Sequence, residues 1–155
     1  MATISSPLTP EAGKVVGEAL QGALVDLIDL SLTAKQAHWN LIGHQFRSVH
    51  LQLDEVVSLA RTHMDVMAER AIALGFNPDG RASTVASTSQ LPHFDSGYIQ
   101  DGKVVAGMTD ILGGIVKRMR ERVASTEQTD PVTQDLLIEA TQDLEKQHWM
   151  WEAQR

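Results

Sequence analysis

Apolar side chains recur at helical spacing along the first part of the chain. The steps between them are three, four and seven residues, as expected for an amphipathic helix that buries one face. These positions are Val16, Leu20, Ala23, Leu27, Leu30, Ala34 and Leu41. Thr9-Pro10-Glu11 is a typical helix start, because it combines an N-cap hydroxyl, a first-position proline and a first-turn acid. The pattern predicts a long helix from Pro10 to near Gly43.

A second long helix is predicted from about Gln45 to Leu74. It would be about 45 Å long at the usual rise per residue. Gly75 suits its C-terminal end. Much of its apolar surface is carried by Val49, Leu53, Val56, Val57, Ala60, Met64, Met67 and Ile72.

Two further helices are predicted, one over about 104–125 and one from Asp130-Pro131 to about Trp151. Residues 76–100 connect helices two and three, and a connection of this length usually carries structure of its own. Residues 84–91 predict a short helix within it. No stretch has the alternation of a β-strand. The fold class is therefore all-α: a ferritin-like four-helix bundle with a long crossover carrying a short helix between helices two and three.

Length and composition limit the kinds of protein that this chain can be. The 155 residues suit a single domain, 1–155, in which 1–9 form a short polar N-terminal tail. No apolar run is long enough for a membrane span, and the N-terminus lacks the features of a secretory signal. The absence of cysteine excludes disulfides, thiolate metal sites and cysteine nucleophiles. We therefore expect a cytoplasmic protein without membrane contact.

The net charge of −7 indicates cations as partners and argues against nucleic acid. Asp and Glu number 20 against 13 Lys and Arg, and the first 34 residues contain one basic side chain, Lys14. An acidic surface repels phosphate backbones, whose binding depends on counterion release by cations. We predict that the chain does not bind DNA directly.

Five residues form a candidate metal-binding set. His38 lies on the first predicted helix, near its apolar stripe. On the second helix, His50, Asp54, Asp65 and Glu69 fall at about 0°, 40°, 60° and 100°, which places them within one quadrant. Imidazole and carboxylate together are the ligand mix of iron and zinc sites.

Distance divides this set in two. Asp54 and Asp65 are about 16 Å apart along a rigid helix, and His50 and Glu69 are about 28 Å apart. Metal–ligand bonds of about 2 Å cannot bridge such gaps. One chain therefore holds two half-sites, one with the two histidines and Asp54, the other with Asp65 and Glu69. Two copies packed antiparallel around a two-fold axis near Leu59 would complete two identical sites.

Simpler interpretations stay open for each member of the set. His38 alone could be a packed core residue. Asp65 and Glu69 could be solvated acids paired with Arg61, Arg70 or His63. A further motif, Glu145-x-x-His148, has the spacing used inside larger di-iron bundles, but those sites need two such motifs and no second one is present. We expect a surface Glu145 and a packed His148.

The stretch 35–75 resembles the signature of the Dps family, the mini-ferritins. The matching motifs are H-W-N at His38–Asn40, Phe46, H-x-x-x-D-E at His50–Glu55 and D-x-x-x-E-R at Asp65–Arg70. The resemblance implies a hollow dodecamer built from dimers, with ferroxidase sites at the dimer interfaces. It implies Fe(II) oxidation, typically by hydrogen peroxide, and storage of ferric oxide. By position, the iron ligands would be His38, His50, Asp54, Asp65 and Glu69, where Zn or Mn could replace iron.

The resemblance also suggests roles for four other residues. Trp39 could donate an electron when a single iron is bound, or it could pack at an interface. Asp130, Asp135 and Glu139 resemble in spacing the acids of the family's three-fold pore, where iron enters. The alternative is that Asp130 caps the last helix and that the other two acids are solvated.

Two rival functions use the same residues. Two bound metals can activate water for amide hydrolysis, although nothing in the sequence supplies a substrate pocket. A helical bundle without metal is the other alternative. It predicts that changes at Asp65 or Glu69 affect stability and leave iron oxidation unchanged.

Overall fold

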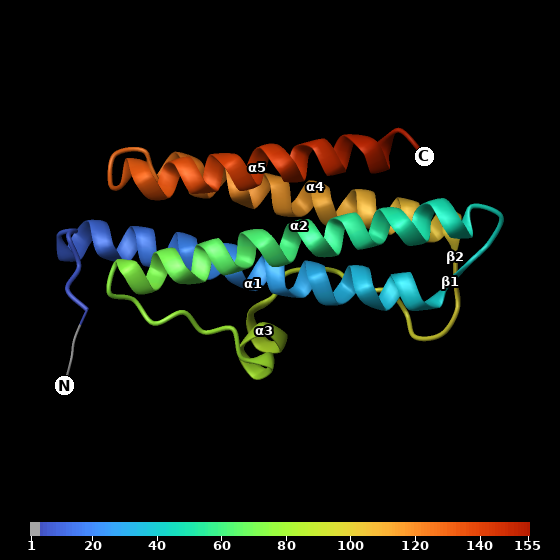
Figure 1. Cartoon of the computed structure of the whole chain (residues 1–155), viewed down its shortest axis with the longest axis horizontal. Helices are drawn as coiled ribbons and strands as arrows, with labels where there is room; N and C mark the ends of the chain where they lie inside the picture. The colour runs from blue at the N-terminus through green and yellow to red at the C-terminus, as the bar shows by residue number, and fades with distance from the viewer. Residues whose placement is uncertain (1–3) are drawn as a thin grey trace.

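Four long helices run side by side in the computed structural model, which describes residues 4–155 (Figure 1). They are α1 (Pro10–Asn40), α2 (Phe46–Ala73), α4 (Asp101–Thr126) and α5 (Pro131–Glu152). The crossover from α2 to α4 carries the short helix α3 (Ala82–Thr88), which lies beside α1. The predicted four-helix bundle with a helix in its crossover is confirmed. Residues 1–3 of the predicted polar tail lie outside the described residues.

The ends of the helices follow from local chemistry. The Thr9 hydroxyl accepts a hydrogen bond from the Ala12 amide, and Asp130 accepts one from the Thr133 amide, so both N-caps are as predicted. At the end of α2, Gly75 takes a φ of 82°, and the Phe76 amide donates to the Ala71 carbonyl at 2.9 Å. That left-handed residue stops α2 because side chains other than glycine rarely adopt it.

A two-residue parallel pair, β1 (Leu41–Ile42) with β2 (Ile99–Gln100), was not predicted. It joins the end of α1 to the start of α4 and is too short to leave an alternating pattern in the sequence. Beside it, the Asp101 carboxylate accepts a hydrogen bond from the Gln45 amide at 2.7 Å. The turn between α1 and α2 is thereby held in place.

The core lies between the four long helices. Every predicted apolar position of α1, from Val16 to Leu41, is at most 2% exposed. On α2 the prediction holds for most of the stripe, but Ile72 is 40% exposed and Met64 is only partly buried. From α4 and α5 the core receives large side chains such as Met108, Leu112, Ile115, Leu137 and Trp151. Among residues 4–155, no helix is apolar over a length that would cross a membrane.

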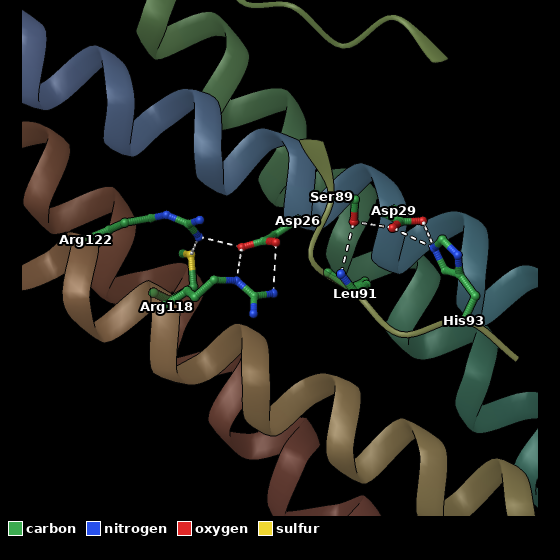
Figure 2. A network of polar contacts seen from close by, with 8 residues as sticks. Asp26, Asp29, Ser89, Leu91, His93, Arg118 and Arg122 are labelled. Atoms are coloured by element: carbon green, nitrogen blue, oxygen red, sulfur yellow. Dashed lines mark hydrogen bonds and ion pairs between the residues drawn. The ribbon is translucent and has the colours of Figure 1, made fainter. Parts of the chain in front are cut away.

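Polar groups attach the crossover and α4 to α1 (Figure 2). Buried Asp29 accepts hydrogen bonds from Ser89 and from His93 Nε2, the latter at 2.9 Å. One turn earlier on α1, buried Asp26 accepts hydrogen bonds from Arg118 and Arg122 of α4. These carboxylates fix α1 against two segments that are distant in sequence.

Candidate metal centre

His38 and His50 stack face to face where α1 ends and α2 begins. Their ring centroids are 3.6 Å apart and their planes differ by 19°. Nδ1 of each ring lies 2.9 Å from the backbone carbonyl oxygen of the other residue. Because a carbonyl only accepts hydrogen bonds, each Nδ1 carries a proton, so in the neutral form of each ring Nε2 is the nitrogen with the lone pair. That tautomer is the one that binds a metal through Nε2.

Asp54 lies one turn after His50 and is about half exposed. Its Oδ1 atom is 3.4 Å from His38 Nδ1 and 2.6 Å from the Lys35 ammonium. The hydrogen bond from the Lys35 ammonium is the largest of the contacts that lower the pKa of Asp54. The carboxylate is therefore charged, and it already has a cationic partner. Sequence reasoning missed Lys35, although its place one turn before His38 on α1 was a usable signal.

Asp65 and Glu69 share an exposed face of α2. Among residues 4–155, neither carboxylate has a cationic side chain within 4.0 Å. Two of the partners considered from sequence are engaged elsewhere, since Arg70 donates to Asp130 at 2.7 Å and His63 Nε2 lies 2.8 Å from Asp143. Both carboxylates keep their oxygen lone pairs available.

The described part of the chain, residues 4–155, does not gather three or more His, Asp or Glu side chains into one metal-binding group. His38 and His50 stack and Asp54 Oδ1 lies 3.4 Å from His38 Nδ1, but the three do not converge on one point, and Asp65 and Glu69 lie further along α2. A metal ion held by all five residues would therefore need groups from more than one molecule.

Several large apolar side chains of α1 and α2 are exposed or pack on the histidines. Phe46 stacks on the His50 ring with centroids 5.0 Å apart. Trp39 is 66% exposed and, with Leu32, lines a groove of about 330 Å³ between α1 and the crossover. Leu51 and Ile72 are also exposed on α2. Both interpretations of Trp39, packing and electron donation, stay open.

The three predicted pore acids occupy different environments. Asp130 is buried, with its side chain 7% exposed, and it contacts both Arg70 and the Thr133 hydroxyl. Burial alone would raise the pKa of Asp130, but hydrogen bonds from Thr133 and Arg70 outweigh it and hold that pKa below its usual value. Asp135 and Glu139 are exposed on α5. Asp130 thus has the capping role considered from sequence, and a pore role for all three acids stays a prediction.

The Glu145-x-x-His148 motif lies where the sequence suggested. Glu145 forms an ion pair with Arg120 of α4. His148 is partly buried against Gly113, where an added Cβ would lie 3.1 Å from its Nε2 atom. Within residues 4–155, neither residue belongs to a metal-binding cluster with His38, His50, Asp54, Asp65 or Glu69.

The comparison with known proteins decides the family. The ferritin-like domain family model matches residues 17–155. A DNA protection during starvation protein from Agrobacterium fabrum is 33% identical over 147 residues, which cover 94% of this chain and 91% of that protein. The structure of Mycobacterium smegmatis Dps superposes with a TM-score of 0.92 at 29% identity, covering 99% of this chain and 93% of the other. The chain belongs to the Dps family.

This Dps chain also matches DNA protection during starvation protein 2 from Deinococcus radiodurans, with 35% identity over 136 residues. The match covers 88% of the chain, and the chain spans 56% of that relative's length. The resemblance inferred from the stretch 35–75 is thereby confirmed at the level of the family.

Proposed function

We propose that this Dps chain is a ferroxidase and iron-storage subunit. Two copies complete two-metal sites from His38, His50 and Asp54 of one molecule and Asp65 and Glu69 of the other. The observation that carries the proposal is the reciprocal hydrogen bonding of the histidines through Nδ1, which within residues 4–155 leaves both Nε2 atoms without a hydrogen-bond partner, with Asp54 Oδ1 3.4 Å from His38 Nδ1. Iron is the substrate of this site, with Zn or Mn as substitutes.

The need for a second copy rests on the distances along α2. This helix runs unbroken from Phe46 to Ala73, so Asp54 and Asp65 stay about 16 Å apart. An antiparallel pair of α2 helices around a two-fold axis near Leu59 brings each half-site to its complement. The exposed Leu51, Ile72 and Trp39 would then be covered by the partner.

The ligand set suits oxidation of Fe(II). Carboxylates favour Fe(III), because their charge stabilises the higher oxidation state, and neutral imidazoles limit the negative charge of the site. Two Fe(II) ions each give up one electron, and one peroxide accepts both with two protons to form two water molecules. Because the two electrons arrive together, no hydroxyl radical is released. Trp39, beside His38, would supply an electron when only one iron is bound.

Storage extends the proposal to the assembly. Twelve copies would enclose a cavity in which ferric oxide accumulates. Asp135 and Glu139, one helical turn apart, would line a three-fold pore with Asp130 at its base and attract Fe²⁺. Several relatives are named for DNA protection during starvation. In this chain we propose protection by removal of iron and peroxide, because its charge of −7 opposes binding to DNA.

Mixing two inactive variants tests the shared site. His50→Ala removes one half-site and the double change Asp65→Ala, Glu69→Ala removes the other. Each variant alone should lose peroxide-driven Fe(II) oxidation. After co-refolding in equal amounts, half of the dimers are mixed, and each mixed dimer has one intact site out of two. We therefore expect about a quarter of the parent activity. Light scattering on the same samples gives the oligomeric state.

The outcomes separate the alternatives. No recovery in the mixture would show that the site lies within one chain and would overturn the proposal. Iron oxidation at the parent rate in either variant would remove the changed residues from the site, as the interpretation without a metal at these residues predicts. Amide hydrolysis, assayed with Zn, Mn and Fe on the parent protein, tests the remaining sequence-based alternative.

A further inference from the structure

Arg122 of α4 has hydrogen-bonding capacity that the protein does not use. Its Nη1 atom donates to Asp26 at 2.7 Å and lies 3.6 Å from the Met119 sulfur (Figure 2). Within residues 4–155, Nε and Nη2 of the same guanidinium have no hydrogen-bond acceptor. These two atoms form one edge of the guanidinium, and that edge is the geometry that binds an oxyanion through two parallel hydrogen bonds.

Among residues 4–155, Asp26 is the one carboxylate within ion-pair distance of Arg122, and Arg122 shares it with Arg118. Asp26 is 3% exposed, and both of its oxygens are occupied, since Arg118 donates to Oδ1 at 2.9 Å and to Oδ2 at 3.0 Å. Two guanidiniums therefore share one carboxylate, which leaves one positive charge in a mostly buried place. Arg118 donates both its Nε and its Nη2 hydrogen bonds to Asp26. The unused pair of donors therefore belongs to Arg122.

Gly22 of α1 leaves space at the free edge of Arg122. A Cβ at this position would lie 2.8 Å from Nη2 and 3.1 Å from Nε. Any other residue would therefore occupy the volume next to the two unused donors. Gly22, Gln90 and Arg122 line two adjoining grooves of about 450 and 570 Å³, so the edge faces space that a small molecule can enter.

The first groove offers uncharged donors beside this edge. The Asn77 and Gln90 amides line it and, within residues 4–155, have no side-chain hydrogen bond. Its other acid, Asp79, is neutralised by Arg81 at 2.6 Å. The second groove carries exposed Glu18 and Glu121, which repel anions. An anion would therefore bind on the side of the first groove.

We propose that Arg122, Gly22 and Gln90 form a binding site for a small phosphate-type oxyanion between α1, α4 and the crossover. The occupant is a free anion, because Arg122 is only 16% exposed and the neighbouring Glu18 and Glu121 repel a nucleic-acid backbone. Bound there, the anion would contact α1, α4 and the crossover at once. The site is independent of the iron half-sites on α2.

Titration of the full-length protein with inorganic phosphate tests the site. The protein is first treated with EDTA, because phosphate also binds ferric iron, and ionic strength is kept constant with chloride. We expect about one phosphate per chain, competition by sulfate, and binding at least about tenfold weaker in Arg122→Gln. Arg122→Lys keeps the charge but loses the paired donors, so it should also bind more weakly.

A pair of glycine variants controls for folding. Gly22→Ala fills the space at the Arg122 edge without changing charge and should weaken phosphate binding by about tenfold. Gly114→Ala places a Cβ at an ordinary 3.6 Å from Arg118 and should bind phosphate like the parent. Unchanged binding in both Arg122→Gln and Gly22→Ala, or no phosphate binding by the parent, overturns the proposal. Duplex DNA that binds through Arg122 when free phosphate does not would overturn it as well.

Discussion

His38 and His50 orient each other through the backbone: Nδ1 of each ring lies 2.9 Å from the carbonyl oxygen of the other residue. Both acceptors belong to the main chain, at the end of α1 and within α2. The two rings therefore have the metal-binding tautomer before any ion arrives, which reduces the reorganisation that binding requires.

A first prediction concerns these rings. His38→Ala removes one ligand but leaves the backbone acceptor of His50 in place, so His50 stays oriented. We expect Zn²⁺ binding to weaken by at least about tenfold in His38→Ala and in His50→Ala alike. Calorimetric titration of the assembled protein measures this. Equal Zn²⁺ affinity in the parent and both variants would remove the histidines from the site.

Lys35 should compete with metal for Asp54. Its ammonium lies 2.6 Å from Asp54 Oδ1, so an incoming cation has to displace it. Lys35→Met should bind Zn²⁺ about tenfold more tightly, because the carboxylate is then unpaired. Lys117→Met changes an exposed lysine on α4 and serves as the matched control. Weaker binding in Lys35→Met would show that Lys35 organises the site.

The Arg70–Asp130 pair should make stability depend on pH. The folded pKa of Asp130 is lowered, so its contribution is complete above the unfolded value of about 4 and is lost as pH falls through the folded pKa. Asp130→Asn should destabilise the protein by about 2–3 kcal/mol at pH 7, and this difference should shrink below about pH 4. Urea unfolding at fixed protein concentration measures it. Asp135→Asn, which changes an exposed acid on α5, should have little effect.

Removing the buried carboxylate of Asp26 should destabilise the protein more than removing the exposed carboxylate of Asp110. Asp26→Ala leaves Arg118 and Arg122 mostly buried without a counter-ion, and should cost about 3 kcal/mol or more. Asp110 pairs with Arg155 at 2.7 Å at the surface, and Asp110→Ala should cost less than about 1 kcal/mol. Similar losses in both variants by chemical unfolding would contradict this ranking.

The helices were predictable because their signals are local. Thr9, Gly75 and Asp130 act on backbone groups within a few residues, and the apolar stripe of α1 needs only the helical period. The pair β1–β2 was missed because two residues cannot show a period. Ile72 follows Met67 by five residues, which turns it about 140° away from the buried face, and the core position there is taken by Ala71, which is 4% exposed.

The side-chain contacts of the site were harder to predict from the sequence, because they join residues that are far apart in the chain. His38 and His50 could be chosen as ligands, but their mutual hydrogen bonds depend on how α1 and α2 pack. The partner of Asp130 is Arg70, sixty residues away in sequence. Asp65 and Glu69 look like solvated acids in a single chain, since their proposed function requires a second copy.

Because α2 is continuous, it also fixes the rotation and the distance between Asp54 and Asp65 about its axis. One residue inserted between Asp54 and Asp65 would rotate everything beyond it by about 100° and shift it by about 1.5 Å. In the proposed dimer both metal sites would then be lost at once. Each copy supplies His50 and Asp54 to one site and Asp65 and Glu69 to the other, so the insertion misplaces one half of each site. We therefore expect the segment between Asp54 and Asp65 to tolerate substitutions far better than insertions or deletions.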